Sequence, residues 1–482
     1  MQRTLPLVVI GSLLLTPVLA GDVTGTDPTG PPNVLIIMTD DHRRADTLEF
    51  MPKTMAWFRE DGTDYTQAFS AAAICCPARS TVWVGQYIHN SGVFTTALAG
   101  NIDEDASIQR YLQDAGYTTA AFGKFFNSYP LTRTPKYFDD WAFHGSGYTN
   151  VAFNDHGVRR TVDYSPLFIK GRAQGFLAAT EANDTQPWYV YLTPYAPHSP
   201  WIPEEKYANV LYPPWLGNPA TQEVDRTDKP QHVQATVPLL SAAAGAPFDK
   251  GPEAVTTLAQ VSSNVPFDRQ IYLRTLLTVD DMVDEIMTQL EAQGELENTL
   301  VIFTADQGLL WGEHGWYNKM VPYTDSIQVP FFLRYPAGGV AAGASTDRIV
   351  STVDMLPTIL DAADLAPNAT KTHDGRSLLD ASWTREYALS EFNSQNLPTT
   401  SPVPTWVSLR SHDLQYVEYY NAQRQVTFRE LYDLDTDPWQ LDNRFASTNV
   451  LDPVTAEETA ALSALVAAAR ACRGATGTTT CP

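Results

Sequence analysis

The chain contains short runs of apolar residues that end directly at acidic or basic side chains. Asn33 to Thr39 (NVLIIMT) is such a run, followed at once by two aspartates. A continuous apolar run of this length is typical of a strand buried on both faces, as in a parallel sheet. The runs Trp188 to Thr193 and Leu300 to Thr304 have the same character, and shorter strands are predicted at 117–122, 330–334 and 348–353.

A different period marks the helices. Between Arg269 and Gly294 the apolar residues recur at helical spacing, and a glycine ends the pattern. Further helices are predicted at 107–115 and 355–363. Because strands and helices alternate, we predict an α/β layered fold with a mostly parallel central sheet. Tyr212 to Pro266, rich in proline, alanine and polar residues, is expected to be an irregular excursion over the surface.

The pattern changes from Glu386 onward. Short strands are predicted at 406–409, 414–419 and 426–432, and an alanine-rich helix at 456–471. We therefore predict a small C-terminal α+β domain with an antiparallel sheet, residues 386–482, after a catalytic domain of residues 33–385.

The first twenty residues have the layout of a secretory signal. Arg3 precedes an apolar stretch from Leu5 to Leu15, and small residues lead to a cleavage site near Ala20. Residues 21–32 are expected to be a linker. No other apolar stretch is long enough to span a bilayer. The mature protein is therefore expected to be secreted or otherwise extracytoplasmic.

Composition narrows the class of protein. With 482 residues, 44% hydrophobic and 18% charged, the chain can bury a large core in two or more domains. A formal net charge of −23 argues against a partner that is nucleic acid or an anionic membrane. Cys472 and Cys481 near the end are expected to form a local disulfide. Cys75 and Cys76 are adjacent and poorly placed to pair.

Several polar residues fall just after predicted strands, where parallel sheets place their ligands. They are Asp40, Asp41, Lys124, His198, Asp306 and Gln307. The four acids and amides supply oxygen ligands from two loops, as a hard divalent cation requires. A metal is favoured because these carboxylates would otherwise repel one another. The alternative is that Asp40 and Asp41 only cap the next helix.

A second cluster surrounds the two adjacent cysteines, in the order Cys75-Cys76-Pro77-Ala78-Arg79. Proline is favoured as the first helical residue, so Cys75 should lie at a helix N-terminus, where N–H groups and the dipole favour an anion. Arg79, one turn in, adds a cation with a fork of donors suited to an oxyanion. The alternative is that both cysteines are ordinary small buried residues.

This segment, Cys75 to Gly85, resembles the C-x-P-x-R signature of the type I sulfatases. Other segments similar to that family are 33–41, 276–286, 304–319, 325–336 and 430–443. The double cysteine, the closing cysteine pair and the segments 87–90, 123–127 and 196–201 look closest to the N-acetylglucosamine-6-sulfatase branch. The resemblance implies an alkaline-phosphatase-like fold.

The resemblance also implies a mechanism. A formylglycine-generating enzyme would oxidise Cys75 to formylglycine (3-oxoalanine) during maturation, and the aldehyde would be hydrated to a geminal diol. One hydroxyl, polarised by Ca²⁺ or else Mg²⁺, attacks sulfur, and the second then expels sulfate. The implied metal ligands are Asp40, Asp41, Cys75, Asp306 and Gln307.

The resemblance also implies roles for the other site residues. Asp306 would accept the proton beside the nucleophile. The sulfate oxygens would be held by Arg79, Lys124 and Lys319. His198, together with Lys319, would protonate the leaving oxygen, because imidazole titrates near neutral pH.

Two positions depart from the family. Gln307 stands where Asn or Asp is usual, and its extra methylene moves the ligand oxygen. Phe126 stands where many members carry a histidine two residues after Lys124, which leaves the base for sulfate elimination open. His314 is either a turn residue or a substrate contact. His89 is expected behind the signature helix, and Asp280 and Asp281 are expected to orient that helix instead of taking part in the chemistry.

Three functions follow from these residues. The first is a sulfuric ester hydrolase acting on a sulfated small molecule or glycan, such as 6-sulfated N-acetylglucosamine, or on an aryl sulfate. The second is a phosphodiesterase or phosphonate hydrolase on the same scaffold. The third is a catalytically silent glycan-binding protein in which Cys75 is never oxidised.

Overall fold

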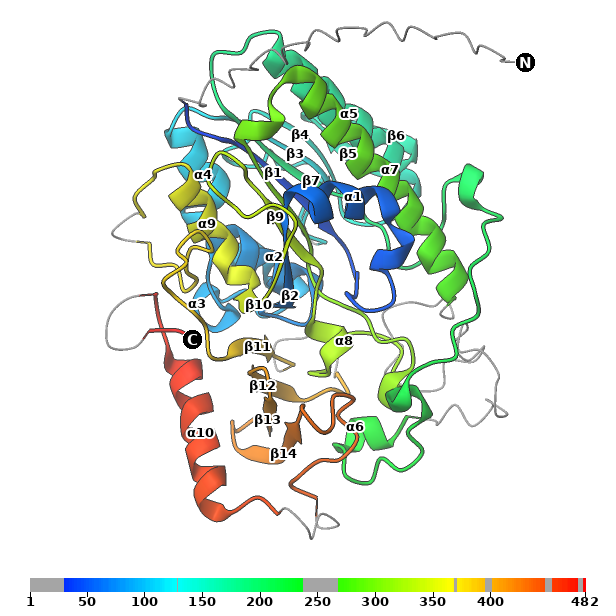
Figure 1. Cartoon of the computed structure of the whole chain (residues 1–482), viewed down its shortest axis with the longest axis vertical. Coiled ribbons are helices and arrows are strands. Elements are labelled where there is room, and N and C mark those ends of the chain that lie inside the picture. Colours follow the sequence, from blue (N-terminus) through cyan, green and yellow to red (C-terminus); the bar gives the residue numbers. More distant parts are fainter. Residues whose placement is uncertain are drawn as a thin grey trace, which may run out of the picture.

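A ten-stranded mixed sheet forms the centre of the molecule (Figure 1). The computed structural model describes residues 30–127, 129–236, 268–367, 371–394, 401–446, 453–475 and 480–482. The strand order is β10-β2-β9-β8-β1-β7-β3-β4-β5-β6. The strands are β1 (Asn33–Thr39), β2 (Thr63–Phe69), β3 (Thr118–Lys124), β4 (Asp140–His144), β5 (Thr149–Asp155), β6 (Val158–Tyr164), β7 (Trp188–Thr193), β8 (Thr299–Ala305), β9 (Phe331–Arg334) and β10 (Ala344–Ser351).

The sheet is parallel where the site lies and antiparallel elsewhere. Neighbours β8, β1, β7, β3 and β4 run parallel, as do β10 and β2. Strand β9 is inserted antiparallel between β2 and β8, and β5 and β6 extend the far edge as an antiparallel hairpin. The predicted fold class, with its mostly parallel centre, is confirmed.

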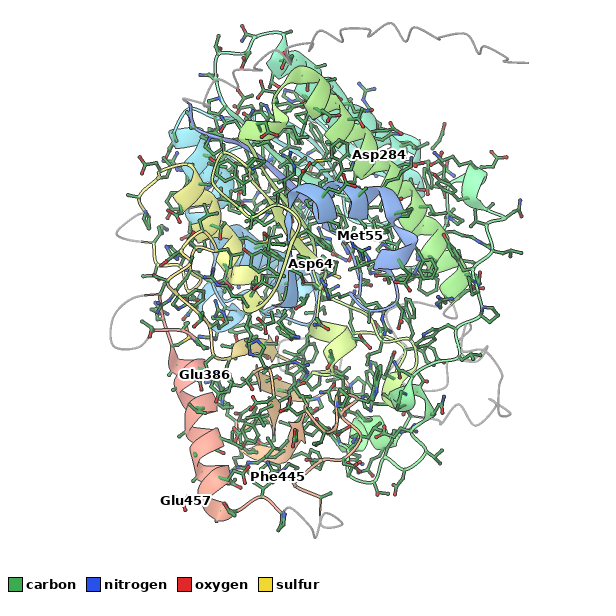
Figure 2. All side chains as sticks on the ribbon, viewed as in Figure 1. Met55, Asp64, Asp284, Glu386, Phe445 and Glu457 are labelled. Carbon is green, nitrogen blue, oxygen red and sulfur yellow. A yellow bond between two sulfur atoms is a disulfide. The ribbon has the colours of Figure 1, made fainter. Side chains whose placement is uncertain are left out.

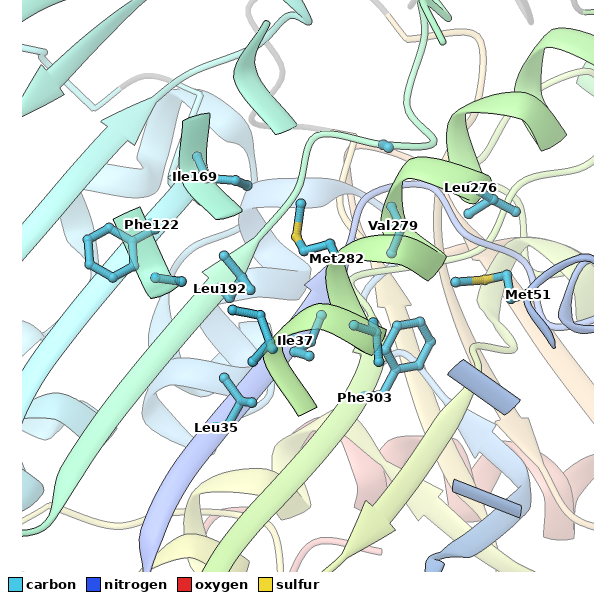
Figure 3. Close-up of a cluster of buried hydrophobic side chains, with 14 of the residues drawn as sticks. Leu35, Ile37, Met51, Phe122, Ile169, Leu192, Leu276, Val279, Met282 and Phe303 are labelled. Carbon is cyan, nitrogen blue, oxygen red and sulfur yellow. The ribbon is translucent and has the colours of Figure 1, made fainter. Parts of the chain in front are cut away.

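Strand β1 is buried on both faces, as its continuous apolar sequence predicts. Leu35 and Ile37 point into a core layer that also holds Phe122, Leu192 and Phe303 (Figure 3). Its alternate residues, among them Val34 and Ile36, pack into a second layer on the opposite face. This period of two fixes which side chains meet which helices.

Helices cover both faces of this sheet. The first layer is closed by α1 (Pro52–Asp61), α5 (Ser165–Glu181) and α7 (Arg269–Gln293). The second is closed by α2 (Cys75–Val84), α4 (Ile108–Asp114) and α9 (Met355–Ala362). Single-turn helices are α3 (Ile88–Ser91), α6 (Gln231–Gln234) and α8 (Thr324–Ile327). The described 3-10 helices are 48–50, 96–101, 104–106, 205–207, 219–222, 296–298, 313–315 and 352–354.

The C-terminal region carries its own four-stranded antiparallel sheet, in the order β11-β12-β13-β14. Its strands are β11 (Ala388–Phe392), β12 (Thr405–Arg410), β13 (Leu414–Tyr420) and β14 (Val426–Asp433). Helix α10 (Ala456–Ala471) runs alongside, with Glu457 at its start and Glu386 beside its other end (Figure 2). The expected Cys472–Cys481 disulfide closes the chain behind α10 and is confirmed.

Most predicted elements are present within a residue or two, whereas β2, β4, β5, β6, β11, α1 and α5 were not predicted. The described part of the expected excursion, 212–236, holds only short helical turns. Its remainder lies outside the described residues, as do the proposed signal segment and nearly all of the linker. No helix in the described parts of the chain is both long and apolar enough to cross a bilayer.

Candidate active site

Four adjacent strands deliver polar side chains to one edge of the sheet. Strands β8, β1, β7 and β3 lie side by side and parallel, so their carboxyl ends meet. Asp40 follows β1, Asp306 follows β8, and Lys124 is the last residue of β3. The backbone N–H of Asp306 donates to the Thr39 carbonyl (3.1 Å), which fixes the two acidic turns against each other. The sequence prediction that these residues converge is confirmed.

Helix α2 brings Cys75 to the same edge. The helix begins at Cys75 itself, after an extended Ile74, and ends at Gly85 in the left-handed region (φ 60°). Pro77 is therefore the third helical residue and not the first, a correction to the sequence prediction. Its missing N–H still lies within the first turn, where N–H groups have no helical partner, so the proline is accommodated. The expected position of Cys75 at a helix N-terminus is confirmed.

The Cys75 thiol lies among charged and polar side chains. Its Sγ is 2.9 Å from the Lys319 Nζ, 3.5 Å from the Gln307 Nε2 and 3.6 Å from the Asp40 Oδ1. Only 4% of the residue is exposed. Burial raises the pKa of the thiol to about 12, despite the nearby lysines. A thiol that stays protonated at neutral pH is a poor nucleophile.

The carboxylates of Asp40 and Asp41 each bind a lysine: Asp40 pairs with Lys124, and Asp41 with Lys319. Burial alone would raise the pKa of Asp40, but Lys124 and the neighbouring cations outweigh it and hold that pKa well below its usual range. The helix-capping alternative is excluded, because the next helical turn begins only at Leu48.

Asp306 has a different environment. Its Oδ1 accepts the backbone N–H of Asp41 (3.1 Å), and its Oδ2 accepts the Nε of Arg79 (3.0 Å). The side chain is fully buried, and burial together with the charge of Asp40 raises its pKa to about 7. Two carboxylates in one site therefore have separated pKa values, the arrangement expected when only one of them exchanges protons.

These residues fit a hard divalent cation. Asp40, Asp41, Cys75 and His198 each offer a ligand atom, and the four atoms lie within 4.8 Å of one another. The Oε1 of Gln307 is buried and has no hydrogen-bond partner, whereas its Nε2 faces Asp41 and Cys75. Amide oxygen and nitrogen are assigned from their partners, so a half-turn would direct the orphaned oxygen to the same space. Oxygen ligands are those that Ca²⁺ and Mg²⁺ prefer.

Arg79 contacts other site residues. Its Nε donates to Asp306, its Nη1 donates to the Lys124 carbonyl (3.1 Å), and its Nη2 lies 3.7 Å from the Asp40 carboxylate. Two donors are thus already engaged in fixing neighbouring groups. The Nη2 is buried and has no hydrogen-bond partner among the described residues.

His198 lies behind Asp41. Its Nδ1 lies 2.5 Å from the Ser199 carbonyl, and its Nε2 lies 3.4 Å from the Asp41 Oδ2. Burial lowers the pKa of His198 to about 4. The imidazole is therefore neutral at pH 7, with Nδ1 as the protonated nitrogen and Nε2 facing the acidic group.

The sequence analysis missed a buried network behind the site. Arg43 is fully buried and donates to Glu313 (2.9 Å) and Asp325 (2.7 Å), with its guanidinium 4.3 Å from the Trp311 ring centroid. Glu313 also accepts the backbone N–H of Trp311 (2.6 Å). This network ties the turn after β1 to the loop that carries Gln307 and Lys319. The one feature of the sequence that could have indicated this network is the position of Arg43, two residues after the acidic pair.

The remaining predicted residues lie outside the group around Cys75. His314 adopts φ 54° in a turn and its Nδ1 lies 2.9 Å from Glu223. His89, on α3, pairs with Glu391 (2.8 Å). Asp280 accepts the backbone N–H groups of residues 53 and 54 at the start of α1, so it orients α1 and not the signature helix α2. Phe126 packs on Trp83, with ring centroids 5.1 Å apart.

The ten-stranded mixed sheet with helices on both faces is the alkaline-phosphatase-like fold that the resemblance implies. A family model described as sulfatase matches residues 32–365, and one described as N-sulphoglucosamine sulphohydrolase, C-terminal, matches residues 312–467. The chain belongs to the sulfatase family, a family of sulfuric ester hydrolases.

Individual relatives agree with this assignment. The chain is 30% identical to an extracellular sulfatase SULF-1 homolog of Drosophila melanogaster, over 75% of this chain but only 32% of the relative's length. It is 26% identical to the N-acetylglucosamine-6-O-sulfatase of Bacteroides thetaiotaomicron, over 87% of this chain and 83% of that one. A protein whose structure was solved in complex with its substrate D-glucosamine-2-N,6-O-disulfate has the same fold, with a TM-score of 0.71. The two chains are 23% identical, over 91% of this chain and 97% of the other.

Proposed function

We propose that the protein hydrolyses sulfate monoesters, with Cys75 converted to formylglycine and a divalent cation beside it. The observation that carries the proposal is the convergence of Asp40, Gln307 and Lys319 on the Cys75 Sγ, within 3.6 Å. An unmodified thiol at this position would be a poor nucleophile, because burial raises its pKa to about 12.

The cation and the formylglycine would supply a polarised oxygen nucleophile when both are in place. Asp40, Asp41, Asp306 and Gln307 would hold the cation, at the place where the Cys75 side chain also reaches. Lys124 and Lys319 are buried cations suited to the sulfate oxygens.

Proton movement would involve Asp306 and Lys319. Asp306 would accept the proton beside the nucleophile, because its buried carboxylate lies among the charged groups that act on Cys75. Arg79 would keep that carboxylate oriented. Lys319 is the better donor to the leaving oxygen than His198, because His198 is neutral before an anion binds.

We also propose the substrate class and the setting of the enzyme. Relatives named N-acetylglucosamine-6-sulfatase support a 6-sulfated N-acetylglucosamine unit as the substrate. Relatives named extracellular sulfatases support secretion after cleavage near Ala20. Maturation would require a formylglycine-generating enzyme. The separate four-stranded sheet supports a domain boundary near residue 386.

The test is a substrate panel with protein produced in a host that converts the cysteine. Sulfate release would be measured from an aryl sulfate, from 6-sulfated N-acetylglucosamine and from its unsulfated 6-phosphate analogue, alongside a phosphate diester. We expect sulfate release from the first two and its loss in Cys75→Ala. Turnover of the phosphate diester alone would favour a phosphodiesterase, and binding of sulfated sugar without any turnover would favour a silent glycan-binding protein.

A further inference from the structure

A cavity of about 340 Å³ lies away from the residues of the candidate active site. It is formed where α3, the ends of β11, β12 and β13, and the last turn of α10 come together. None of the residues around Cys75 lines it. Glu391 lies in the wall of the cavity. Its backbone carbonyl accepts the backbone N–H of Ala73 (3.4 Å), and Ala73 lies two residues before Cys75.

The cavity is basic in a strongly acidic protein. Arg424, Arg470 and Arg473 line it, and within the described ranges no carboxylate lies within ion-pair distance of any of the three. The one acidic side chain in the wall, Glu391, is paired with His89 at 2.8 Å. A concentration of unpaired positive charge in a chain of formal charge −23 marks a place where an anion is attracted.

The other walls suit a sugar ring. Phe94, which is half-buried, lines the cavity together with the buried rings of Trp406 and Tyr420, and Asn90 and Thr405 add polar groups. Aromatic faces with a few polar groups that fix orientation are the usual construction of a small-ligand site. Arg470 lies with its guanidinium 4.2 Å from the Tyr420 ring centroid, which fixes its planar fork against the aromatic wall.

We propose that this cavity binds an anionic sugar unit of an extended substrate chain, one or more units away from the sulfate that is cleaved. This proposal rests on the proposed function, because it specifies the substrate further, as an anionic oligosaccharide instead of a single sulfated sugar. Two linked sites on one chain raise the effective concentration at each. Oligosaccharides should therefore be bound more tightly than the single sugar.

The test uses the double variant Arg424→Ala/Arg473→Ala, because both side chains are exposed and neither forms a hydrogen bond or ion pair with another described residue. Losing charge-assisted contacts should raise the KM for a sulfated tetrasaccharide about tenfold. The kcat for the tetrasaccharide and the kcat/KM for an aryl sulfate should stay unchanged. The matched control is Arg59→Ala/Arg159→Ala, which removes two exposed arginines from α1 and β6.

An unchanged KM for the tetrasaccharide would overturn the proposal, and so would an equal rise in the control variant. Titration of the tetrasaccharide and of its desulfated, carboxylated form into Cys75→Ala protein, with and without the arginine substitutions, distinguishes sulfate from carboxylate as the recognised group. Arginine-dependent binding of either form supports the cavity. This titration needs no turnover, so it tests the cavity even if the wild-type protein hydrolyses no sulfate ester. A lack of hydrolysis would contradict the proposed function but not the proposed binding site.

Discussion

The ammonium group of Lys319 lies 2.9 Å from the sulfur of Cys75, although 244 residues separate them in the chain. Both side chains are buried, and Lys319 also binds the Asp41 carboxylate. A buried lysine held by an aspartate beside a helix N-terminus is in position to stabilise charge that develops on a transferred group.

Replacing Lys319 tests this placement. Lys319→Ala should lower kcat for an aryl sulfate by about 10²-fold to 10³-fold, the usual effect of removing one transition-state donor. Steady-state kinetics with a far-UV CD check of folding would measure it. Lys136→Ala is the matched control, since the Lys136 side chain is half exposed and pairs with Asp105 (3.3 Å) at the surface. Equal activity in both variants would remove Lys319 from the mechanism.

Removal of divalent cations should lower both stability and activity. Asp40, Asp41 and Asp306 are buried together, and a cation that binds only the folded state stabilises it by about 2.7 kcal/mol at one hundred times its Kd. Treatment with a chelator should lower the Tm and abolish sulfate release, and added Ca²⁺ should restore both. A Tm that does not respond to chelator or to Ca²⁺ would argue that no cation binds there.

Gln307 provides a sharper test of the ligand set. Because its buried Oε1 has no partner, Gln307→Asn should keep or raise the affinity for Ca²⁺, as the shorter amide is the family's usual residue. Gln307→Ala should lower that affinity about tenfold or more. Calorimetric titration of Ca²⁺ into each variant measures the effect. If all three proteins bind alike, Gln307 is not a ligand.

The pH dependence of stability should include a contribution from His144. This side chain is buried between Phe153 and Tyr195, and burial lowers its pKa from 6.5 to about 3. The unfolded chain therefore takes up a proton as the pH falls below 6.5 and the folded protein does not, so the free energy of unfolding decreases. Between pH 6.5 and 5 the loss from this one group is about 2 kcal/mol.

The variant His144→Phe should lose less stability over that pH interval than the wild type. The free energy of unfolding of each protein would be measured with denaturant at pH 6.5 and at pH 5. The comparison uses the change between the two pH values, so a loss of stability that is the same at both pH values does not affect it. His156→Gln is the control, because His156 lies in the nearby β5–β6 turn and its side chain is 59% exposed. Identical pH slopes for His144→Phe and the wild type would contradict the assignment.

Local sequence patterns predicted the elements whose structure is determined locally. Strand β1 and helix α7 each carry an unbroken apolar period, and both appear at the predicted residues. Helix α5 was missed because Pro166, Gly171 and Gly175 lower its intrinsic propensity, and it is held by packing on the sheet. The antiparallel insertion of β9 was not predictable either, since it depends on pairing with β2 and β8.

The same distinction applies to the site. Side chains that directly follow apolar strands could be predicted to meet, because parallel strands end at a common edge. The Arg43–Glu313 contact spans 270 residues and depends on how two loops fold back over the sheet. Arg79 was predicted to hold the sulfate, but its Nε donates to Asp306 instead. This pairing could not be predicted from the spacing of residues in the sequence.

The chemical state of Cys75 tests the central claim most directly. Mass spectrometry of the peptide containing Cys75, from enzyme produced natively and active on a sulfate ester, should show a lighter residue in which oxygen has replaced sulfur as an aldehyde. An intact thiol at Cys75 throughout a fully active preparation would contradict the account.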